Sequence, residues 1–398
     1  MILSKKVLVV GGFDRSLLNF RGALLRAMVQ AGHKVIGVAP QETRGVPQAL
    51  SDIGVRYVPF TLTRAGLNPI VDVLTLRRLK ALFQHECPDV LLSYTIKPVI
   101  YGSLAAKWAG VPRIYALITG LGAAFNTSGF KGRVLRFITV TMYRISLKRC
   151  TKVFVQNQEI ADLFTRENIV PTDKLRVVAG SGVDTSHFTF SPMPEGAPIF
   201  LLLARMLRDK GVEEYVAAAR LVKAQIPQAR FLLVGDTDPN PAAISRKQLD
   251  QWNAEGGIEY LSAVSDVRAL LSDCFVYVLP SYHEGLPRSV LEAMAVGRPI
   301  ITTDTIGCRE TIFEAGDPDP VHGCRRGRNG FLVPVRSVEP LAAAMKMLIH
   351  DRDMATSMGR ESRTLVEEYF DVGIINSLML RSMDLCPTQA NVPDFSGT

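Results

Sequence analysis

The chain has 398 residues, of which 47% are hydrophobic and 21% charged; this is typical of a folded protein with a large core and excludes wholesale disorder. No stretch reaches the ~18 uninterrupted apolar residues of a membrane-spanning helix, and the first residues read as a strand, not a signal peptide. The six cysteines form no Cys-x-x-Cys pair, so the sequence indicates neither zinc nor a disulfide framework and favours reduced thiols in the cytoplasm. The net charge of +8 favours an anionic partner, which the sign alone leaves open between nucleotide, phospholipid and nucleic acid.

Strand-like and helix-like patterns alternate along the chain. Six buried strands are predicted at residues 5–10, 34–39, 55–60, 89–94, 113–119 and 152–157. The pattern then restarts, with six more at residues 198–204, 230–236, 258–261, 274–280, 299–304 and 330–334. Such alternation predicts parallel sheets covered by helices on both faces. The sequence therefore predicts an α/β protein with two doubly wound, Rossmann-like sheets.

The stretch "FTFSPMPEGAP" (188–198) interrupts this pattern with Pro, Gly and Ser, which is typical of a linker. We therefore expect an N-terminal domain at residues 1–190 and a C-terminal domain at residues 191–365. Residues 366–398 are expected to form a helix that packs back towards the N-terminal domain, followed by a loose tail. Ligands of doubly wound sheets bind beyond the carboxyl ends of the strands, and two such edges can face each other across a cleft.

The segment "SYHEGLPRSVLEAMAVGRPIITT" (281–303) places two acids, Glu284 and Glu292, with seven residues between them. It predicts a loop, a helix from about Pro287 to Val296 and the next strand. Pro287 suits the first helical position, and Gly297 suits the left-handed residue just past the helix end. The predicted buried stripe of this helix consists of Val290, Leu291 and Met294.

The backbone N–H groups around Gly285 and Leu286, at the start of this helix, suit a phosphate or carboxylate. Glu284 in the loop could accept hydrogen bonds from a polyhydroxylated ligand, and Glu292, further along, could hold a second part of the same ligand. Taken alone, the spacing is equally compatible with one capping acid and one exposed acid.

This segment resembles the Glu-x7-Glu signature of family 4 glycosyltransferases, which have the two-domain GT-B fold. "LLLARMLRDKGVEEYVAAA" (201–219) is similar to the first strand and helix of the family's C-terminal domain, and "VVAGSGVDTSHF" (177–188) to the segment that leads into it. "SYTIKPVIYGSLAAKWAGVP" (93–112) and "ITGLG" (118–122) resemble the bacterial branch that builds lipid-linked oligosaccharides, including enzymes that add N-acetylgalactosamine to polyprenyl-diphosphate sugars.

The resemblance implies a role for each matching residue. Glu292 would bind the nucleotide ribose, and Glu284 would hydrogen-bond the donor sugar. Arg205 and Lys210 would neutralise the departing diphosphate, whose charge grows as the glycosidic bond breaks. The resemblance also implies that the anomeric configuration is retained, by front-face attack in which the leaving phosphate takes the acceptor proton.

In the N-terminal half, "VGGF" (10–13) matches the family's glycine turn. The amides of Gly11 and Gly12 are expected to line the cleft near the diphosphate or acceptor; the alternative is a mere tight turn. Lys97 is a candidate for the acceptor's phosphate, or else a solvated surface lysine. Many family members place a histidine near the donor sugar in this domain, but "YALITGLGAAF" has Thr119 and Gly120 and no histidine, so we assign no catalytic histidine.

The triplet Asp236-Thr237-Asp238 looks like the Asp-x-Asp metal site of a different glycosyltransferase fold. It lies in "GDTDPNP", whose composition favours a turn. The cysteines and histidines show no ligand spacing, His33 is expected to be structural, and His283 is a weak candidate for substrate contact. We expect neither a metal nor another cofactor, with a UDP-sugar as co-substrate.

A helix predicted over residues 131–150 has an unusual distribution of basic and apolar residues. Its sheet-facing stripe is predicted to consist of Val134, Leu135, Ile138, Met142 and Ile145. The opposite side carries Arg133, Arg136, Arg144 and Lys148, interleaved with Phe137, Val140 and Leu147. Basic residues mixed with large apolar ones favour a surface that rests in an anionic membrane interface. The competing interpretation is a basic face beside a subunit contact or nucleic acid.

Together these features predict a retaining glycosyltransferase of the cytoplasm, peripheral on the inner face of the cytoplasmic membrane. It would move a sugar, with N-acetylgalactosamine favoured, from a UDP-sugar to a polyprenyl-diphosphate-linked saccharide in surface-glycan or glycoprotein-glycan assembly. One alternative is a UDP-N-acetylhexosamine epimerase of the same architecture. Another is a nucleic-acid-binding protein, which only the net charge supports because no reading module is recognisable; we expect no nucleic-acid partner.

Overall fold

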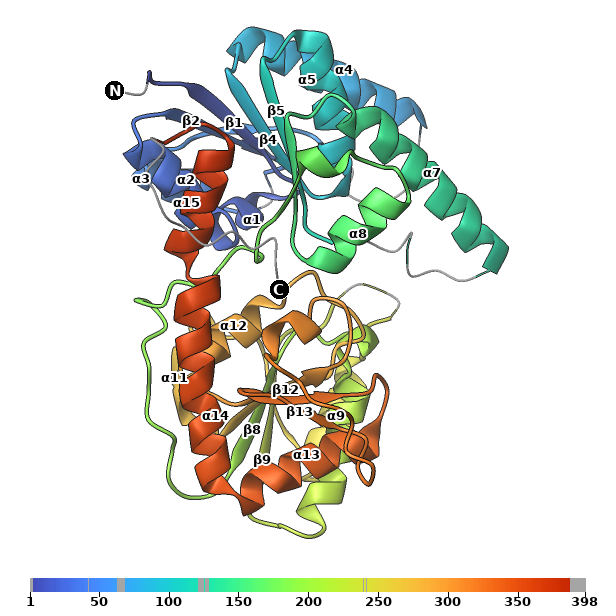
Figure 1. The fold of residues 1–398 in the computed structure, drawn as a ribbon, viewed down its shortest axis with the longest axis vertical. Coiled ribbons are helices and arrows are strands. Elements are labelled where there is room, and N and C mark those ends of the chain that lie inside the picture. The colour runs from blue at the N-terminus through green and yellow to red at the C-terminus, as the bar shows by residue number, and fades with distance from the viewer. Residues whose placement is uncertain are drawn as a thin grey trace. The chain divides into compact units, whose positions relative to one another are not determined.

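The computed structural model describes residues 3–41, 43–62, 69–120, 125, 129–238, 240 and 242–386 (Figure 1). The chain forms two compact units, one made of Met1–Ser181 with Gly373–Thr398 and the other of Gly182–Val372. The expected boundaries at residues 190 and 365 both fall inside the second unit. The tail expected to be loose, from residue 387 on, lies outside the described residues, as do residues 121 and 122 of the "ITGLG" motif.

Residues 182–190 belong to the second unit because they are hydrogen-bonded to its last helices. The Val183 amide donates to Phe370 O and the Val372 amide donates to Val183 O, both at 2.9 Å. The Arg363 guanidinium donates to Phe188 O at 2.8 Å and to Thr185 O at 3.2 Å. The break in the apolar pattern therefore marks a segment packed along the second unit, and the division between the units comes earlier.

The first unit contains a seven-stranded sheet with the order β3-β2-β1-β4-β5-β6-β7, all parallel. Its strands are β1 (Lys6–Val10), β2 (Lys34–Ala39), β3 (Arg56–Pro59), β4 (Val90–Tyr94), β5 (Arg113–Ile118), β6 (Lys152–Val155) and β7 (Leu175–Val177). All six predicted strands are present. The edge strand β7 was missed, because three residues are too few to show a period.

Helices cover both faces of this sheet (Figure 1). One face packs on α1 (Asp14–Asn19), α2 (Gly22–Gln30), α3 (Val46–Asp52) and α15 (Val372–Ser382). The other packs on α4 (Pro69–Glu86), α5 (Ser103–Ala109), α7 (Gly129–Leu147) and α8 (Gln158–Arg166). Val7 and Val9 of β1 point into the first of these cores, and Leu8 and Val10 point into the second, as the two-residue period of a strand requires.

The second unit repeats the plan with the strand order β10-β9-β8-β11-β12-β14-β13. Its strands are β8 (Ile199–Leu203), β9 (Arg230–Val234), β10 (Glu259–Leu261), β11 (Val276–Leu279), β12 (Ile300–Thr303), β13 (Arg325–Arg326) and β14 (Gly330–Val333). The six predicted strands are again present and parallel. The unpredicted β13 is a two-residue strand that pairs antiparallel with β14 at the sheet edge.

The helices of this unit are α9 (Val212–Lys223), α10 (Arg246–Ala254), α11 (Arg268–Asp273), α12 (Arg288–Ala295), α13 (Val338–His350) and α14 (Arg352–Leu365). In each sheet the strand order reverses once, between β1 and β4 in the first unit and between β8 and β11 in the second. Such switch points are where doubly wound sheets bind ligands. Within the described parts of the chain, no helix is long and apolar enough to cross a membrane.

Candidate functional site

The switch point of the second unit brings together three of the predicted site residues. Arg205 follows β8, Lys210 ends a short 3₁₀ turn before α9, and Glu284 lies in the loop after β11. Lys210 Nζ lies 2.6 Å from Glu284 Oε1, and both side chains are 17% exposed. Although 74 residues separate them in sequence, they form a charge-assisted hydrogen bond that still reaches solvent. A ligand that binds at this edge would therefore contact the Lys210 ammonium and the Glu284 carboxylate, whose relative position their hydrogen bond fixes.

The helix α12 confirms most of the local prediction. Gly297 is left-handed, with φ of +84°, and the predicted stripe of Val290, Leu291 and Met294 is buried. The position of Pro287 was wrong by one residue, because its ψ of 108° makes it the N-cap and the helix starts at Arg288. Gly285 and Leu286 lie just before this cap, where the prediction places a bound phosphate.

Glu292 lies one turn into α12 and pairs with Arg288, with Nε 3.0 Å from Glu292 Oε1. Burial is the largest influence on the carboxyl and raises its pKa above the ordinary value, and Arg288 opposes that effect. Sequence analysis did not predict a role for Arg288. The i, i+4 spacing in "RSVLE" was the available signal, since residues at that spacing are neighbours on a helix.

Arg205 is paired with Asp238, whose Oδ2 lies 2.8 Å from the guanidinium. Asp238 also accepts from the Asn240 amide, and Asp236 accepts from the Ala263 amide, each at 2.9 Å. Both aspartates thus organise the loop after β9, which fits the predicted turn. Arg205 is 66% exposed, so its ion pair is weak and an anionic ligand can replace it. Among the described residues, no three His, Cys, Asp or Glu side chains gather as metal ligands would.

At the switch point of the first unit, two glycines allow a close approach between the ends of β1 and β4. A Cβ on Gly11 would overlap the hydroxyl of Tyr94, and a Cβ on Gly12 would lie 2.8 Å from Thr95 Oγ1. The Gly11 amide already donates to Val38 O at 2.9 Å, as part of the sheet. Gly11 is therefore needed for close packing against Tyr94, and its amide is already hydrogen-bonded within the sheet.

Lys97 is not the solvated surface lysine that the sequence left open. Its Nζ lies 3.2 Å from Asp72 Oδ1 of α4, and both side chains are largely buried. Burial and then a hydrogen bond to Asp72 raise the pKa of Tyr101, which lies on a π-helix directly after Lys97. Thr95, just before, is a β-branched residue with φ of +68°. Such backbone strain concentrates at functional sites.

The two histidines considered from the sequence lie in different environments. His33 is buried; its Nε2 lies 2.7 Å from Leu385 O and its Nδ1 lies 3.2 Å from the Lys5 amide, so its contacts are structural, as expected. His283 is exposed beside Glu284. Nothing in its surroundings assigns it a role.

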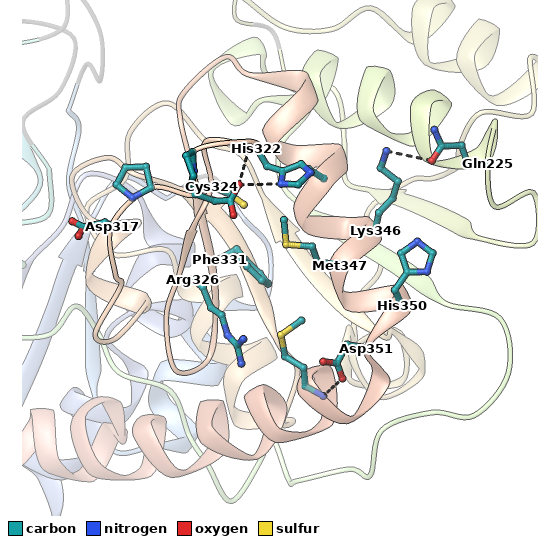
Figure 2. Close-up of a pocket in the computed structure, with 15 residues that line it drawn as sticks. Gln225, Asp317, His322, Cys324, Arg326, Phe331, Lys346, Met347, His350 and Asp351 are labelled. Atoms are coloured by element: carbon teal, nitrogen blue, oxygen red, sulfur yellow. Dashed lines mark hydrogen bonds and ion pairs between the residues drawn. The ribbon is translucent and has the colours of Figure 1, made fainter.

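A pocket of about 800 Å³ lies elsewhere in the second unit, lined by residues 317–320, 322 and 324 and by the end of α13 (Figure 2). Lys346, Met347 and His350 of α13 face it, with Gln225 beyond the end of α9. Both helices run from the carboxyl edge of the sheet to the amino edge. The pocket therefore lies towards the edge opposite Lys210 and Glu284, and no predicted site residue lines it.

The prediction for the helix at 131–150, observed as α7, was wrong in phase. The stripe that packs on the sheet consists of Val140, Tyr143 and Leu147, and Met142 of the predicted stripe, partly buried, also packs against this core. Large apolar side chains that remain exposed on α7 are Phe130, Val134, Phe137, Ile138 and Ile145. At 3.6 residues per turn they share an arc of roughly 100°, and Phe137 is 70% exposed. The exposed face is thus more apolar than predicted.

The basic residues of α7 differ in how they are engaged. Arg136 pairs with Glu167 at 2.7 Å, and Arg144 donates to the backbone carbonyl of the same residue. Arg133 and Lys148 are exposed beside the apolar arc. Arg136 and Arg144, both predicted to face a partner, therefore also hold α7 against Glu167 at the end of α8.

Both halves of the chain match known protein families. Residues 20–180 match the family described as glycosyl transferase 4-like domain, and residues 184–365 match glycosyl transferases group 1. A Campylobacter jejuni protein named N,N'-diacetylbacillosaminyl-diphospho-undecaprenol alpha-1,3-N-acetylgalactosaminyltransferase is 30% identical, over 93% of this chain and 96% of its own length. An Escherichia coli UDP-Gal:alpha-D-GlcNAc-diphosphoundecaprenol alpha-1,3-galactosyltransferase is 23% identical, over 79% of this chain and 80% of its own.

The fold has close counterparts among solved structures. The crystal structure of Anabaena HepE in complex with UDP and glucose superposes with a TM-score of 0.73 at 16% identity, covering 96% of this chain and 99% of that one. This likeness establishes the two-domain GT-B fold that the family resemblance implied, built from the two doubly wound sheets that the strand pattern predicted. Together with the matches to both domains and the full-length relative, it identifies the chain as a member of glycosyltransferase family 4.

Proposed function

We propose that the protein transfers a sugar, with N-acetylgalactosamine as the first candidate, from a UDP-sugar to a saccharide carried on polyprenyl diphosphate. The observation that carries the proposal is the Lys210–Glu284 pair at the switch point of the second unit. The names of both relatives support the acceptor class, since each describes transfer to a diphosphoundecaprenol-linked sugar. The Campylobacter name supports the donor sugar.

In the proposed reaction the donor diphosphate lies against Arg205 and Lys210. The ribose hydroxyls donate to Glu292, and Glu284 orients the sugar. As the bond between the anomeric carbon and the β-phosphate oxygen breaks, negative charge grows on that oxygen, which the two cations stabilise. The acceptor hydroxyl bonds to the anomeric carbon on the same face and gives its proton to the leaving phosphate. The products are UDP and the extended lipid-linked glycan, with configuration retained.

The switch point of the first unit is proposed to receive the acceptor. Lys97 is the candidate for an acceptor phosphate, and the strained Thr95 beside Gly12 supports a functional role for this edge. Asp72 holds Lys97 in the absence of ligand. A phosphate of the acceptor would replace or share that carboxylate.

The direct test offers UDP-N-acetylgalactosamine and related UDP-sugars with a short polyprenyl-diphosphate saccharide. Product mass identifies the sugar transferred, and the anomeric proton coupling identifies the configuration. Transfer with an α-linkage is expected. Absence of transfer from every UDP-sugar would contradict the proposal. Conversion of the donor to its epimer without acceptor would instead support the epimerase alternative.

We further propose that the protein rests on the inner face of the cytoplasmic membrane through α7. Support comes from its exposed apolar arc with Arg133 and Lys148 alongside. Interfacial helices combine shallow apolar burial with attraction of basic residues to anionic lipid, worth ~1 kcal/mol for each lysine or arginine near the surface. The anionic membrane predicted as the partner of the helix at residues 131–150 thus remains the proposal, but the residues proposed to face the lipid are different.

Vesicle sedimentation tests this proposal. Phe137→Asp combined with Ile145→Asp should release the protein from phosphatidylglycerol vesicles, because both side chains lie in the exposed arc. Val321→Asp is the matched control, since Val321 is an exposed apolar residue of the second unit. If the double variant sediments as the parent does, α7 is not the membrane surface.

Catalysis is also proposed to need no metal or other cofactor. Protein cations at the switch point and the start of α12 would hold the diphosphate in place of a metal. Most of the activity should then survive EDTA. Complete loss in EDTA that millimolar Mg²⁺ or Mn²⁺ restores, with equal loss in Asp236→Asn and Asp238→Asn, would contradict this.

A further inference from the structure

The loop after β11 is bonded directly to the 3₁₀ turn that carries Lys210. The Tyr282 amide donates to Asp209 O at 2.8 Å, and Ser281 Oγ donates to the same carbonyl at 3.1 Å. Lys210 follows Asp209, and Glu284 follows Tyr282 by two residues. Any movement of this junction would therefore change the register of the Lys210–Glu284 pair.

The side chain of Tyr282 is held from two sides. Its hydroxyl donates to Glu214 Oε1 at 2.7 Å, and the Arg336 guanidinium lies 4.7 Å from the ring centroid. Burial, followed by the hydrogen bond to Glu214, raises the pKa of Tyr282 to about 12, so the phenol keeps its proton and remains the donor. Glu214 belongs to the first turn of α9, and Arg336 precedes Ser337, the N-cap of α13. These two helices pack together, and the ring contacts the first turn of α9 and the residue before the N-cap of α13.

Two features of this arrangement are unfavourable for stability. Arg336 is a non-glycine residue with φ of +58°. Glu214 Oε2 is buried, and no described residue bonds to it. Unpaired buried oxygens and left-handed backbone cost free energy, and they persist where a functional geometry requires them.

We propose that Tyr282 is a positioning residue that holds the Lys210–Glu284 pair in its reactive register, acting through Glu214 and Arg336. The inference rests on the proposed donor site. Tyr282 would not touch the reacting atoms. Its hydrogen bond to Glu214 attaches the Glu284 loop to α9, the helix that follows Lys210. Since a misplacement of ~1 Å at a reacting centre can cost up to roughly 10²-fold in rate, loosening this clamp should lower kcat more than donor affinity.

The experiment compares Tyr282→Phe, Glu214→Ala and Glu214→Gln in the full-length protein. Tyr282→Phe and Glu214→Ala should each lower kcat by about tenfold, with donor KM and Tm close to the parent values. Glu214→Gln should retain most of the activity, because its amide oxygen still accepts from the Tyr282 hydroxyl. The Tyr282→Phe/Glu214→Ala double variant should be no slower than the slower single variant, since both remove one hydrogen bond.

Parental kcat in Tyr282→Phe overturns the inference. So do additive losses in the double variant, or losses explained by a lower Tm. Hydrogen exchange of the amides at 281–285 gives a readout independent of transfer. The amide of residue 282, which donates to Asp209, should exchange faster in Tyr282→Phe than in the parent; equal protection overturns the inference. If the parent transfers no sugar at all, the proposed function fails, and exchange still decides the role of Tyr282.

Discussion

The two units share one sheet topology but carry different chemistry at their switch points. In the second unit, long charged side chains meet there, as Lys210 does with Glu284 and Arg205 with Asp238. In the first unit the strand ends approach so closely that glycine is required, and one lysine stands beside them in a buried ion pair. The same backbone plan thus gives one edge suited to a charged, polyhydroxylated ligand and another where Lys97 is paired with Asp72 and the Arg21 guanidinium lies over the Tyr94 ring.

This difference shows that topology selects where a ligand binds, and that the residues after the strands select which ligand. A departing diphosphate needs cations that are present throughout the reaction, and Arg205 and Lys210 of the second unit are the residues proposed for this role. The first unit adds a second distinction outside its switch point, the exposed apolar arc of α7. Four predictions test how far the two units differ.

The largest effect is expected from Lys210→Met in the second unit. If Lys210 stabilises the leaving diphosphate, as proposed, its removal should lower kcat by ~10²–10³-fold. Initial rates at saturating donor and acceptor measure this effect. Lys223→Met is the matched control, because Lys223 lies in the last turn of α9, the helix that follows Lys210, and donates to the exposed carbonyl of Gly256. Equal rates for the two variants would remove Lys210 from the site.

Glu292→Gln should weaken UDP binding by ~1.5–3 kcal/mol, the value of a charge-assisted hydrogen bond. The raised pKa of Glu292 gives the sign of the pH dependence. The parent should lose UDP affinity as pH falls through that pKa, since protonation removes the acceptor charge, and Glu292→Gln should not show this loss. Calorimetric titration at pH values from the ordinary carboxyl pKa of 4.5 upwards measures both.

Glu292→Gln should weaken UDP binding but should not lower the stability of the folded protein. A carboxyl whose pKa is raised by folding favours the protonated folded state, so Glu292 subtracts from stability as pH rises above its unfolded pKa. Glu292→Gln should therefore unfold at a Tm no lower than the parent at neutral pH. A lower Tm together with unchanged UDP affinity would make Glu292 a structural residue.

In the first unit, Lys97→Met should raise the acceptor KM by about tenfold while donor KM stays constant, since one charge-assisted contact to phosphate is lost. Asp72→Asn separates a binding role from a structural one. If Lys97 serves the acceptor, Asp72→Asn leaves the acceptor KM unchanged or lower, because the competing carboxylate is removed. Equal damage from both variants would mean that the ion pair is only structural.

The smallest effect compares one core tyrosine in each unit. Tyr143 of α7 is fully buried, and its hydroxyl has no hydrogen-bond partner among the described residues. Tyr215 of α9 is equally buried, but its hydroxyl lies 2.9 Å from Phe200 O and 3.1 Å from Leu232 O. Tyr143→Phe should stabilise its unit by up to ~1 kcal/mol and Tyr215→Phe should destabilise its unit by ~1 kcal/mol. Denaturant unfolding measures both; shifts of the same sign would contradict the comparison.

The local sequence determined the elements and the family. Twelve strands followed from apolar runs and their spacing, and Gly297 marked the end of α12 by its need for a left-handed backbone. The Glu-x7-Glu resemblance was sufficient to predict the family, which the two matched domains confirm, and the roles of Glu284 and Glu292 stay predictions. These features were predictable because each depends on residues close together in the chain.

The phase of α7 was not predictable in this way. Large apolar residues occur on both of its sides, so periodicity could not separate the sheet-facing Tyr143 and Leu147 from the exposed Phe137 and Ile145. Contact with the rest of the core decided which stripe is buried. The division between the units likewise depended on hydrogen bonds from Arg363 to residues far earlier in the chain.

The partners of the site residues were also decided only by tertiary structure. The bonded partners are far apart in sequence: 33 residues separate Arg205 from Asp238, 25 separate Lys97 from Asp72, and 68 separate Tyr282 from Glu214. No local period encodes these pairs. They form because the order of strands in each sheet brings separate loops to one edge, where charged groups that leave water need an opposite charge or a hydrogen bond. The sequence alone specified which residues could do the chemistry, and the sheet order decided which of them meet.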